Sequence, residues 1–276
     1  APRHYVPHYM NPVSNSMAAR IIAIANQKGG VGKTTTCVNL AAALARMNYP
    51  VLLIDMDPQG NATTGCGIDP RKLHMSTCEV LLGERSAEET ILQPEGLEFD
   101  LMPANGDLTA AEIALLQMEQ REYAMKNALK PLLSRYAWIL IDCPPSLNML
   151  TLNALGAADS VLIPMQCEYY ALEGLTGLLN TIEQLRASIN PNLEIEGLLR
   201  TMYDGRNNLA TAVSDQLIEN FGDQVYRTLV PRNIRVAEAP SYGVPVLMYD
   251  PRSKGAIAHI ALAGEMLRRH EKRNIA

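Results

Sequence analysis

The chain has 276 residues, of which 47% are hydrophobic and 19% charged, and its net charge is −5. This balance is typical of a soluble globular protein, excludes a disordered or fibrous chain, and argues against a uniformly basic nucleic-acid binder. Aromatic residues make up only 5% of the chain, which favours an aliphatic core such as that of a parallel sheet covered by helices. The five cysteines form no CxxC pair or His-spaced cluster, so we expect reduced thiols in the cytoplasm.

Residues 1–16 are interrupted by prolines and show no periodicity, so we expect a flexible extension, with Met17 as a candidate natural start. Short aliphatic runs then alternate with amphipathic stretches. The predicted strands are 21–25, 51–55, 97–102, 138–142, 160–164 and 193–202. The predicted helices are 34–47, 108–133, 147–157, 170–188, 207–221 and 253–270. This alternation predicts a doubly wound α/β fold, with a mainly parallel sheet flanked by helices in one domain over 17–276.

The strongest functional motif is KGGVGKTT at residues 28–35, between a predicted strand and a predicted helix. Glycines in this setting let backbone N–H groups turn toward phosphate oxygens, and the helix N-terminus adds positive potential. Lys33 supplies a point charge, and the Thr34 hydroxyl is placed to bind Mg²⁺. The predicted nucleotide-binding residues of the loop are Lys28, Gly29, Gly30, Val31, Gly32, Lys33, Thr34 and Thr35.

Three carboxylates follow other aliphatic strands. Asp55 and Asp57 end the run VLLIDMD, and Asp142 ends WILID. Phosphoryl transfer needs positioning and charge neutralisation, so a carboxylate at this edge can hold the water shell of Mg²⁺ or orient the attacking water. We expect Asp142 to hold the metal through water, with Asp55 as a possible second such group.

The loop departs from the ordinary pattern GxxxxGK[ST], because Gln27 stands where that pattern requires glycine. It resembles the deviant Walker A group, which includes the ParA, MinD, arsenical-pump and nitrogenase iron-protein families. That resemblance implies an ATP-bound sandwich dimer in which Lys28 reaches the partner's phosphates. It also implies that Asp57 orients the hydrolytic water. The catalytic residues implied are therefore Lys28, Lys33 and Asp57.

Further motifs, among them LLIDMDPQGNAT, PMQCEYYALEGL and VPRNIRVAEAPSYG, together resemble the chromosomal ParA (Soj) partitioning ATPases from about residue 20 to 250. The resemblance implies ATP and Mg²⁺ as cofactors, non-specific binding of double-stranded DNA by the ATP dimer, and hydrolysis stimulated by a ParB (Spo0J-like) protein. By position, Arg206 and Arg235 match the arginines that contact DNA, and Pro231 and Asn233 match residues near adenine. The implied location is cytoplasmic and nucleoid-associated.

Other interpretations remain open at this stage. A MinD-like or other ParA-like positioning ATPase would act on a membrane or a protein cargo, but the charged last turn of the chain lacks the bulky apolar residues of an interfacial anchor. A metabolic or redox ATPase is a further class, and Cys143 could suggest an iron–sulfur cluster. No second cysteine stands in a matching position, so we expect Cys143 to be a small packed side chain.

Overall fold

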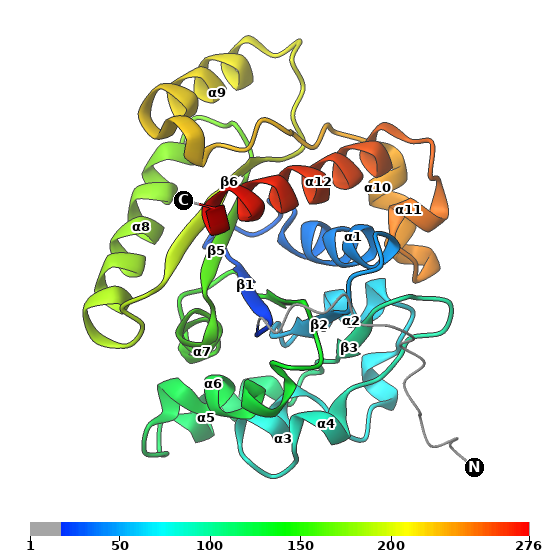
Figure 1. Cartoon of the computed structure of the whole chain (residues 1–276), viewed down its shortest axis with the longest axis vertical. Coiled ribbons are helices and arrows are strands. Elements are labelled where there is room, and N and C mark those ends of the chain that lie inside the picture. The colour runs from blue at the N-terminus through cyan, green and yellow to red at the C-terminus, as the bar shows by residue number, and fades with distance from the viewer. Residues whose placement is uncertain (1–17, 276) are drawn as a thin grey trace.

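A single parallel sheet forms the centre of the computed structural model, which describes residues 18–275 (Figure 1). The extension expected at 1–16 and Met17 lie outside the described residues. The strands are β1 (Arg20–Ile24), β2 (Val51–Asp55), β3 (Asp100–Met102), β4 (Trp138–Asp142), β5 (Ser160–Met165) and β6 (Glu194–Arg200). They lie in the order β3-β2-β4-β1-β5-β6, and every neighbouring pair is parallel. The prediction of a doubly wound parallel sheet is confirmed.

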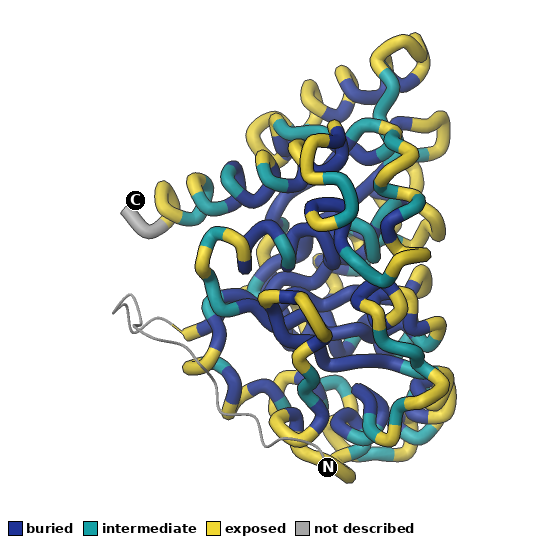
Figure 2. Tube along the Cα trace, turned by 90° about the vertical axis from the view of Figure 1, so that its right-hand side faces the viewer, coloured by how far each residue is buried: buried dark blue, intermediate teal, exposed yellow. Residues whose placement is uncertain are grey.

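Helices cover both faces of the sheet and bury its aliphatic strands. They are α1 (Lys33–Arg46), α2 (Asn61–Gly65), α3 (Thr77–Leu81), α4 (Ala87–Thr90), α5 (Leu108–Leu115), α6 (Ala124–Leu129), α7 (Met149–Ala157), α8 (Ala171–Ser188), α9 (Asn208–Phe221), α10 (Ile234–Glu238), α11 (Val246–Tyr249) and α12 (Lys254–Ile275). Short 3₁₀ helices are η1 (Pro70–Lys72), η2 (Arg121–Tyr123), η3 (Lys130–Leu132), η4 (Gly222–Gln224) and η5 (Ala239–Tyr242). One core lies between the sheet and α1, α11 and α12, and the other lies under α3 and α5 to α9. Figure 2 shows the buried strands at the centre.

The helix predicted over 108–133 is wrong as a single element. The structure divides it into α5, η2, α6 and η3, because Gln120 takes a left-handed conformation with φ 52° and Pro131 cannot donate a backbone hydrogen bond inside η3. Two predicted strands are shorter in the structure: β3 begins at Asp100 instead of residue 97, and β6 spans 194–200 instead of 193–202. Leu97 belongs to a turn, where its N–H donates to the carbonyl of Pro94, and β6 stops before Met202, whose φ is 47°.

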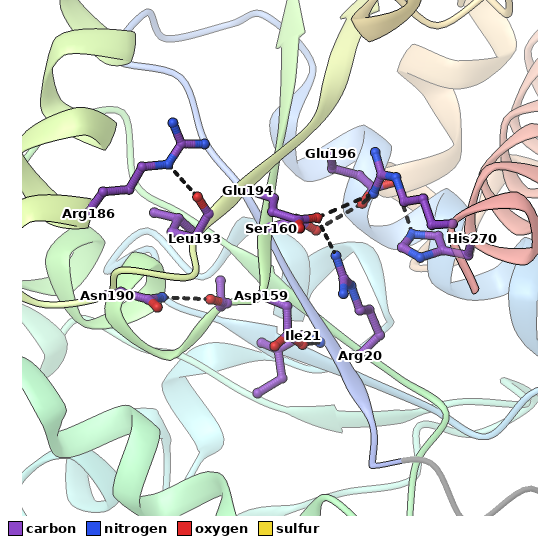
Figure 3. Close-up of polar contacts among 12 residues, drawn as sticks. Arg20, Ile21, Asp159, Ser160, Arg186, Asn190, Leu193, Glu194, Glu196 and His270 are labelled. Atoms are coloured by element: carbon purple, nitrogen blue, oxygen red, sulfur yellow. Dashed lines mark hydrogen bonds and ion pairs between the residues drawn. The ribbon is translucent and has the colours of Figure 1, made fainter. Parts of the chain in front are cut away.

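A buried carboxylate fastens the last helix to the sheet at the edge where β5 and β6 begin (Figure 3). Glu196 accepts hydrogen bonds from the Ser160 hydroxyl at 2.9 Å and the Tyr226 hydroxyl at 3.0 Å. From α12, His270 Nε2 lies 3.0 Å and Arg273 Nη1 lies 3.3 Å from the same carboxylate. These contacts hold the C-terminal part of α12 against the sheet, and its apolar Leu262 and Met266 are fully buried in the core with α1. No helix within 18–275 is long and apolar enough to cross a membrane.

Candidate functional site

The carboxyl ends of three neighbouring strands meet at one edge of the sheet. β4 lies between β1 and β2, and its last residue, Asp142, is in register with Ile24 of β1 and with Asp55 of β2. The loop that follows β1 leads directly into α1 (Figure 1). Parallel topology thus places the glycine-rich loop and the acidic strand ends together, where ligands bind in open α/β sheets.

The glycine-rich loop has the backbone form of an anion cradle. Gly30 and Gly32 adopt φ values of 73° and 86°, and Gly32 caps the N-terminus of the 14-residue helix α1. Such left-handed positions favour glycine, and the free N–H groups of the helix start attract a negative charge. The Thr201 hydroxyl, which follows β6, donates to the carbonyl of Val31 at 2.7 Å and holds the loop in place. These features fit a bound phosphate chain.

Lys33 lies largely buried at the start of α1, and its ammonium donates to the carbonyl of Lys28 at 3.0 Å. Burial lowers the pKa of Lys33, while the nearby carboxylates of Asp142 and Asp57 oppose that change. A buried ammonium that donates to a backbone carbonyl of its own loop is well placed to exchange that contact for phosphate oxygens.

Thr34 and Asp142 form a pair of hard oxygen donors beside the loop. The Thr34 hydroxyl donates to Asp142 Oδ2 at 2.7 Å, and the thiol of Cys37 points to the other oxygen at 3.6 Å. Asp142 is fully buried, and burial followed by repulsion from Asp55 raises its pKa. A hydroxyl and a carboxylate at the end of a phosphate loop match the oxygen chemistry that Mg²⁺ prefers.

The two aspartates after β2 have different surroundings. Asp55 is fully buried and uses both oxygens to hold the following loop: Oδ1 accepts from the N–H of Asp57 at 3.0 Å, and Oδ2 accepts from the N–H and hydroxyl of Thr63 at 2.8 and 2.7 Å. Burial raises its pKa. Asp57 lies two residues beyond the end of β2, and its Oδ1 accepts from the N–H of Gln59. Asp57 is therefore freer to receive a water molecule, and the metal role of Asp55 stays a prediction.

Lys28 extends from the head of the loop toward the surface rather than into its own cradle. Its ammonium pairs with the carboxylate of Glu168, and both side chains are about half exposed. Glu168 follows β5, next to β1 in the sheet. Lys28 is thus presented at the exposed rim, where a second chain could meet it.

The residues expected near adenine lie on a segment that runs beside the end of β6. Pro231 forms a parallel bridge with Tyr203, two residues after the Thr201 that holds the phosphate loop. Asn233 uses its side chain to cap α10, accepting from the N–H groups of Arg235 and Val236. Pro231 therefore lies on the segment next to the one that holds the phosphate loop. Asn233 Oδ1, in contrast, already accepts two backbone hydrogen bonds within its own segment.

The two arginines expected to contact DNA lie in different segments, and each forms an ion pair with a nearby carboxylate. Arg206 precedes α9, has a 92% exposed side chain and binds Asp204 through Nε and Nη2. Arg235, on α10, pairs with Glu238 at 2.9 Å and Asp250 at 3.4 Å. Both pairs are exposed to solvent, which screens their attraction, so either guanidinium can exchange its partner for a phosphate.

Three residues that contact the loop or its helix were missed from the sequence. Glu168 pairs with Lys28, Thr201 donates to the carbonyl of Val31, and the side chain of Asn39 donates to the carbonyl of Thr35 at 2.9 Å. Glu168 and Thr201 stand inside the motifs PMQCEYYALEGL and TMYDGRNNL, but nothing in the sequence shows that they contact the loop.

Cys143 is buried, and burial raises its thiol pKa. Among residues 18–275, no three His, Cys, Asp or Glu side chains gather as a metal cluster.

Comparisons with known proteins agree with this geometry. Residues 19–195 match the protein family described as an AAA domain. The chain is 51% identical to the chromosome partitioning protein ParA of Myxococcus xanthus, over 91% of this chain and 88% of that protein. It is 49% identical to the chromosome-partitioning ATPase Soj of Thermus thermophilus, over 91% and 96% of the two chains.

Among solved structures, the chain superposes with a TM-score of 0.81 on a cobyrinic acid a,c-diamide synthase from Mycobacterium smegmatis that holds an ATP analogue and magnesium. The two are 40% identical, over 92% of this chain and 96% of that one. Identity at this level over nearly the whole length of several relatives shows a common family. Together with the glycine-rich loop, the buried lysine and the acidic strand ends, it places this chain in the ParA family of P-loop ATPases.

Proposed function

We propose that this protein is a chromosome-partitioning ATPase that binds DNA without sequence preference as an ATP-bound dimer and leaves DNA after hydrolysis stimulated by a ParB-like partner. The observation that carries the proposal is that the two lysines of one loop have opposite surroundings. Lys33 is buried beside Asp142, whereas Lys28 stands at the exposed rim. The relatives named ParA and Soj support the partitioning role.

Within one chain, each residue of the site has a task set by its position. Thr34 through its hydroxyl and Asp142 through water would hold Mg²⁺, which would supply charge neutralisation at the phosphates. The N–H groups of the loop and the ammonium of Lys33 bind the phosphate chain. The carboxylate of Asp57 accepts a hydrogen bond from the attacking water and orients it.

A second chain completes the site in this proposal. Lys28 gives up its exposed pair with Glu168 and contributes its charge to the phosphates bound by the partner. The exchange costs little because both side chains of the pair are half exposed. In return the dimer brings two copies of Arg206 and Arg235 onto one DNA duplex, and effective concentration turns weak contacts into useful affinity.

The packing of α12 supports DNA over a membrane as the surface on which this ATPase acts. Its apolar residues Leu262, Ala263 and Met266 are fully buried in the core with α1. An interfacial anchor needs an unpartnered apolar face. A nucleoid location follows from this proposal.

The test is a biosensor titration on two unrelated duplexes with ATP, with ADP and without nucleotide, across a salt series. We expect binding only with ATP, equal on both duplexes, and weakening with salt in proportion to the phosphates contacted. Arg235→Glu should abolish binding without preventing ATP-driven dimerisation. Arg46→Glu is the matched control, because exposed Arg46 lies at the opposite end of α1 from the loop. Equal binding with ADP and ATP would contradict the proposal.

A further inference from the structure

The segment that carries Arg235 is tied into one unit, residues 234–250. Glu238 accepts hydrogen bonds from both Arg235 and the hydroxyl of Tyr249, and Arg235 also reaches Asp250. The rings of Tyr242 and Tyr249 stack with their centroids 4.8 Å apart. A displacement at one part of this segment, which we call the α10–α11 unit, is therefore shared by the rest.

The α10–α11 unit touches, backbone against backbone, the turn at the far end of α2, the short helix into which the Asp57 loop leads. Gly67 follows α2, four residues after the Thr63 that Asp55 holds, and Gly243 follows η5. Both take left-handed conformations, with φ values of 81° and 65°. A Cβ atom on Gly243 would stand 2.6 Å from the Cα of Gly67, and one on Gly67 would stand 3.1 Å from the carbonyl oxygen of Gly243. No side chain lies between the two turns to absorb a movement.

A second connection runs through α1. The buried side chain of Asn39 donates to the carbonyl of Thr35, at the end of the phosphate loop, at 2.9 Å. Its Oδ1 accepts from the N–H of Val246 at 2.8 Å, at the start of α11. Between these connections lies a small, partly open cavity of about 30 Å³, whose lining includes Thr34, Thr35, Asn61, Gly65, Pro240 and Pro245. The start of α1, the helix α2 and the α10–α11 unit therefore border one shared space.

We propose that the Gly67–Gly243 contact and the Asn39 bridge couple the nucleotide site to the α10–α11 unit, so that the state of the Asp57 loop sets the position of Arg235. This rests on the proposed function, and it names the residues that carry its regulation. Close-packed elements transmit displacement rather than deform, and a coupling between two sites needs a contiguous element that both sites bias. In this proposal Gly67, Gly243 and Asn39 are positioning residues, since they act on DNA binding through the placement of Arg235.

The first test measures the ratio of DNA affinities with ATP and with ADP. In Gly243→Ala the added methyl group forces the two turns apart. We expect this ratio to fall at least tenfold, while the affinity of the isolated chain for an ATP analogue stays within about threefold of wild type. The matched control is Gly83→Ala. Gly83 is an exposed glycine that ends the turn after α3 with a φ of 72°, and a Cβ there meets no atom within 4 Å. The control carries left-handed backbone strain without the contact, so it should keep the wild-type ratio.

The second measurement uses the unaltered protein, so that a poorly folding variant cannot decide the outcome. Hydrogen exchange of the amides of Val244 and Val246 is followed with Mg·ATP, with Mg·ADP and without nucleotide, in the absence of DNA. We expect Mg·ATP to slow these amides at least fivefold relative to Mg·ADP, with no change over 208–221.

The outcomes separate the two proposals. If wild type retains DNA equally with ATP and ADP, the proposed function fails, and the exchange experiment still tests the coupling. If wild type depends on ATP but Gly243→Ala keeps the full ratio, or if Val244 and Val246 exchange alike in both nucleotides, the coupling route is overturned.

Discussion

Replacing Glu196 with glutamine tests how the last helix is held to the sheet. Burial alone would raise the pKa of the Glu196 carboxyl above its ordinary value of 4.5. The hydrogen bond and charge of His270, the charge of Arg273 and the hydroxyl of Ser160 outweigh burial and lower this pKa to about 2. Each pKa unit corresponds to about 1.4 kcal/mol, so ionised Glu196 contributes about 3 kcal/mol to the free energy of unfolding at neutral pH. We expect Glu196→Gln to remove most of that contribution.

The pH dependence has a definite sign. Because the pKa is lower in the folded state, the contribution is complete above about pH 4.5 and disappears as the pH falls toward 2. Urea unfolding of wild type and Glu196→Gln at several pH values isolates the group, since other carboxyls cancel in the difference. We expect a difference of about 3 kcal/mol at pH 7 that narrows by about 1 kcal/mol at pH 3.5.

Glu194→Gln is the control for this experiment. Glu194 stands two residues earlier on the same strand and pairs with Arg20 and Arg273, but its side chain is 58% exposed. Exposed pairs contribute at most about 1 kcal/mol, so its loss should be small at every pH. A Glu196→Gln effect no larger than that of Glu194→Gln, or one that stays constant down to pH 3.5, would refute the assignment of Glu196 as the anchor.

Three further predictions concern the site. Lys33→Ala should lose affinity for a fluorescent ATP analogue by at least a hundredfold while its circular dichroism spectrum is unchanged, because the phosphate countercharge is gone; near-normal affinity would remove the loop from nucleotide binding. Lys28→Ala should bind ATP as a monomer, and a dimer peak in light scattering with ATP would make Lys28 a bystander. Asp57→Ala should hold ATP intact in a long-lived dimer, and full turnover in a phosphate-release assay would move the orienting role to another group, Asp55 first.

The sequence by itself was sufficient wherever the determining contacts are local. The strand, the loop of residues 28–35 and the following helix are contiguous, so glycine spacing and the Lys33-Thr34 pair indicate a phosphate loop without further information. Parallel strands all end at one edge, so Asp142 could be assigned to the same rim. The alternation of aliphatic runs with amphipathic stretches was likewise enough to predict the sheet.

The tertiary structure decided whatever depends on groups far apart in the chain. Lys28 and Glu168 are separated by 140 residues, and Asn39 and Val246 by 207, so no periodicity could reveal either contact. Propensity also favoured one long helix over 108–133, but a left-handed Gln120 and the packing of α6 against α7 divide it. The periodicity of apolar residues predicts which face of a helix or strand is buried. Which other element packs on that face depends on how the connections between strands are arranged in the whole sheet.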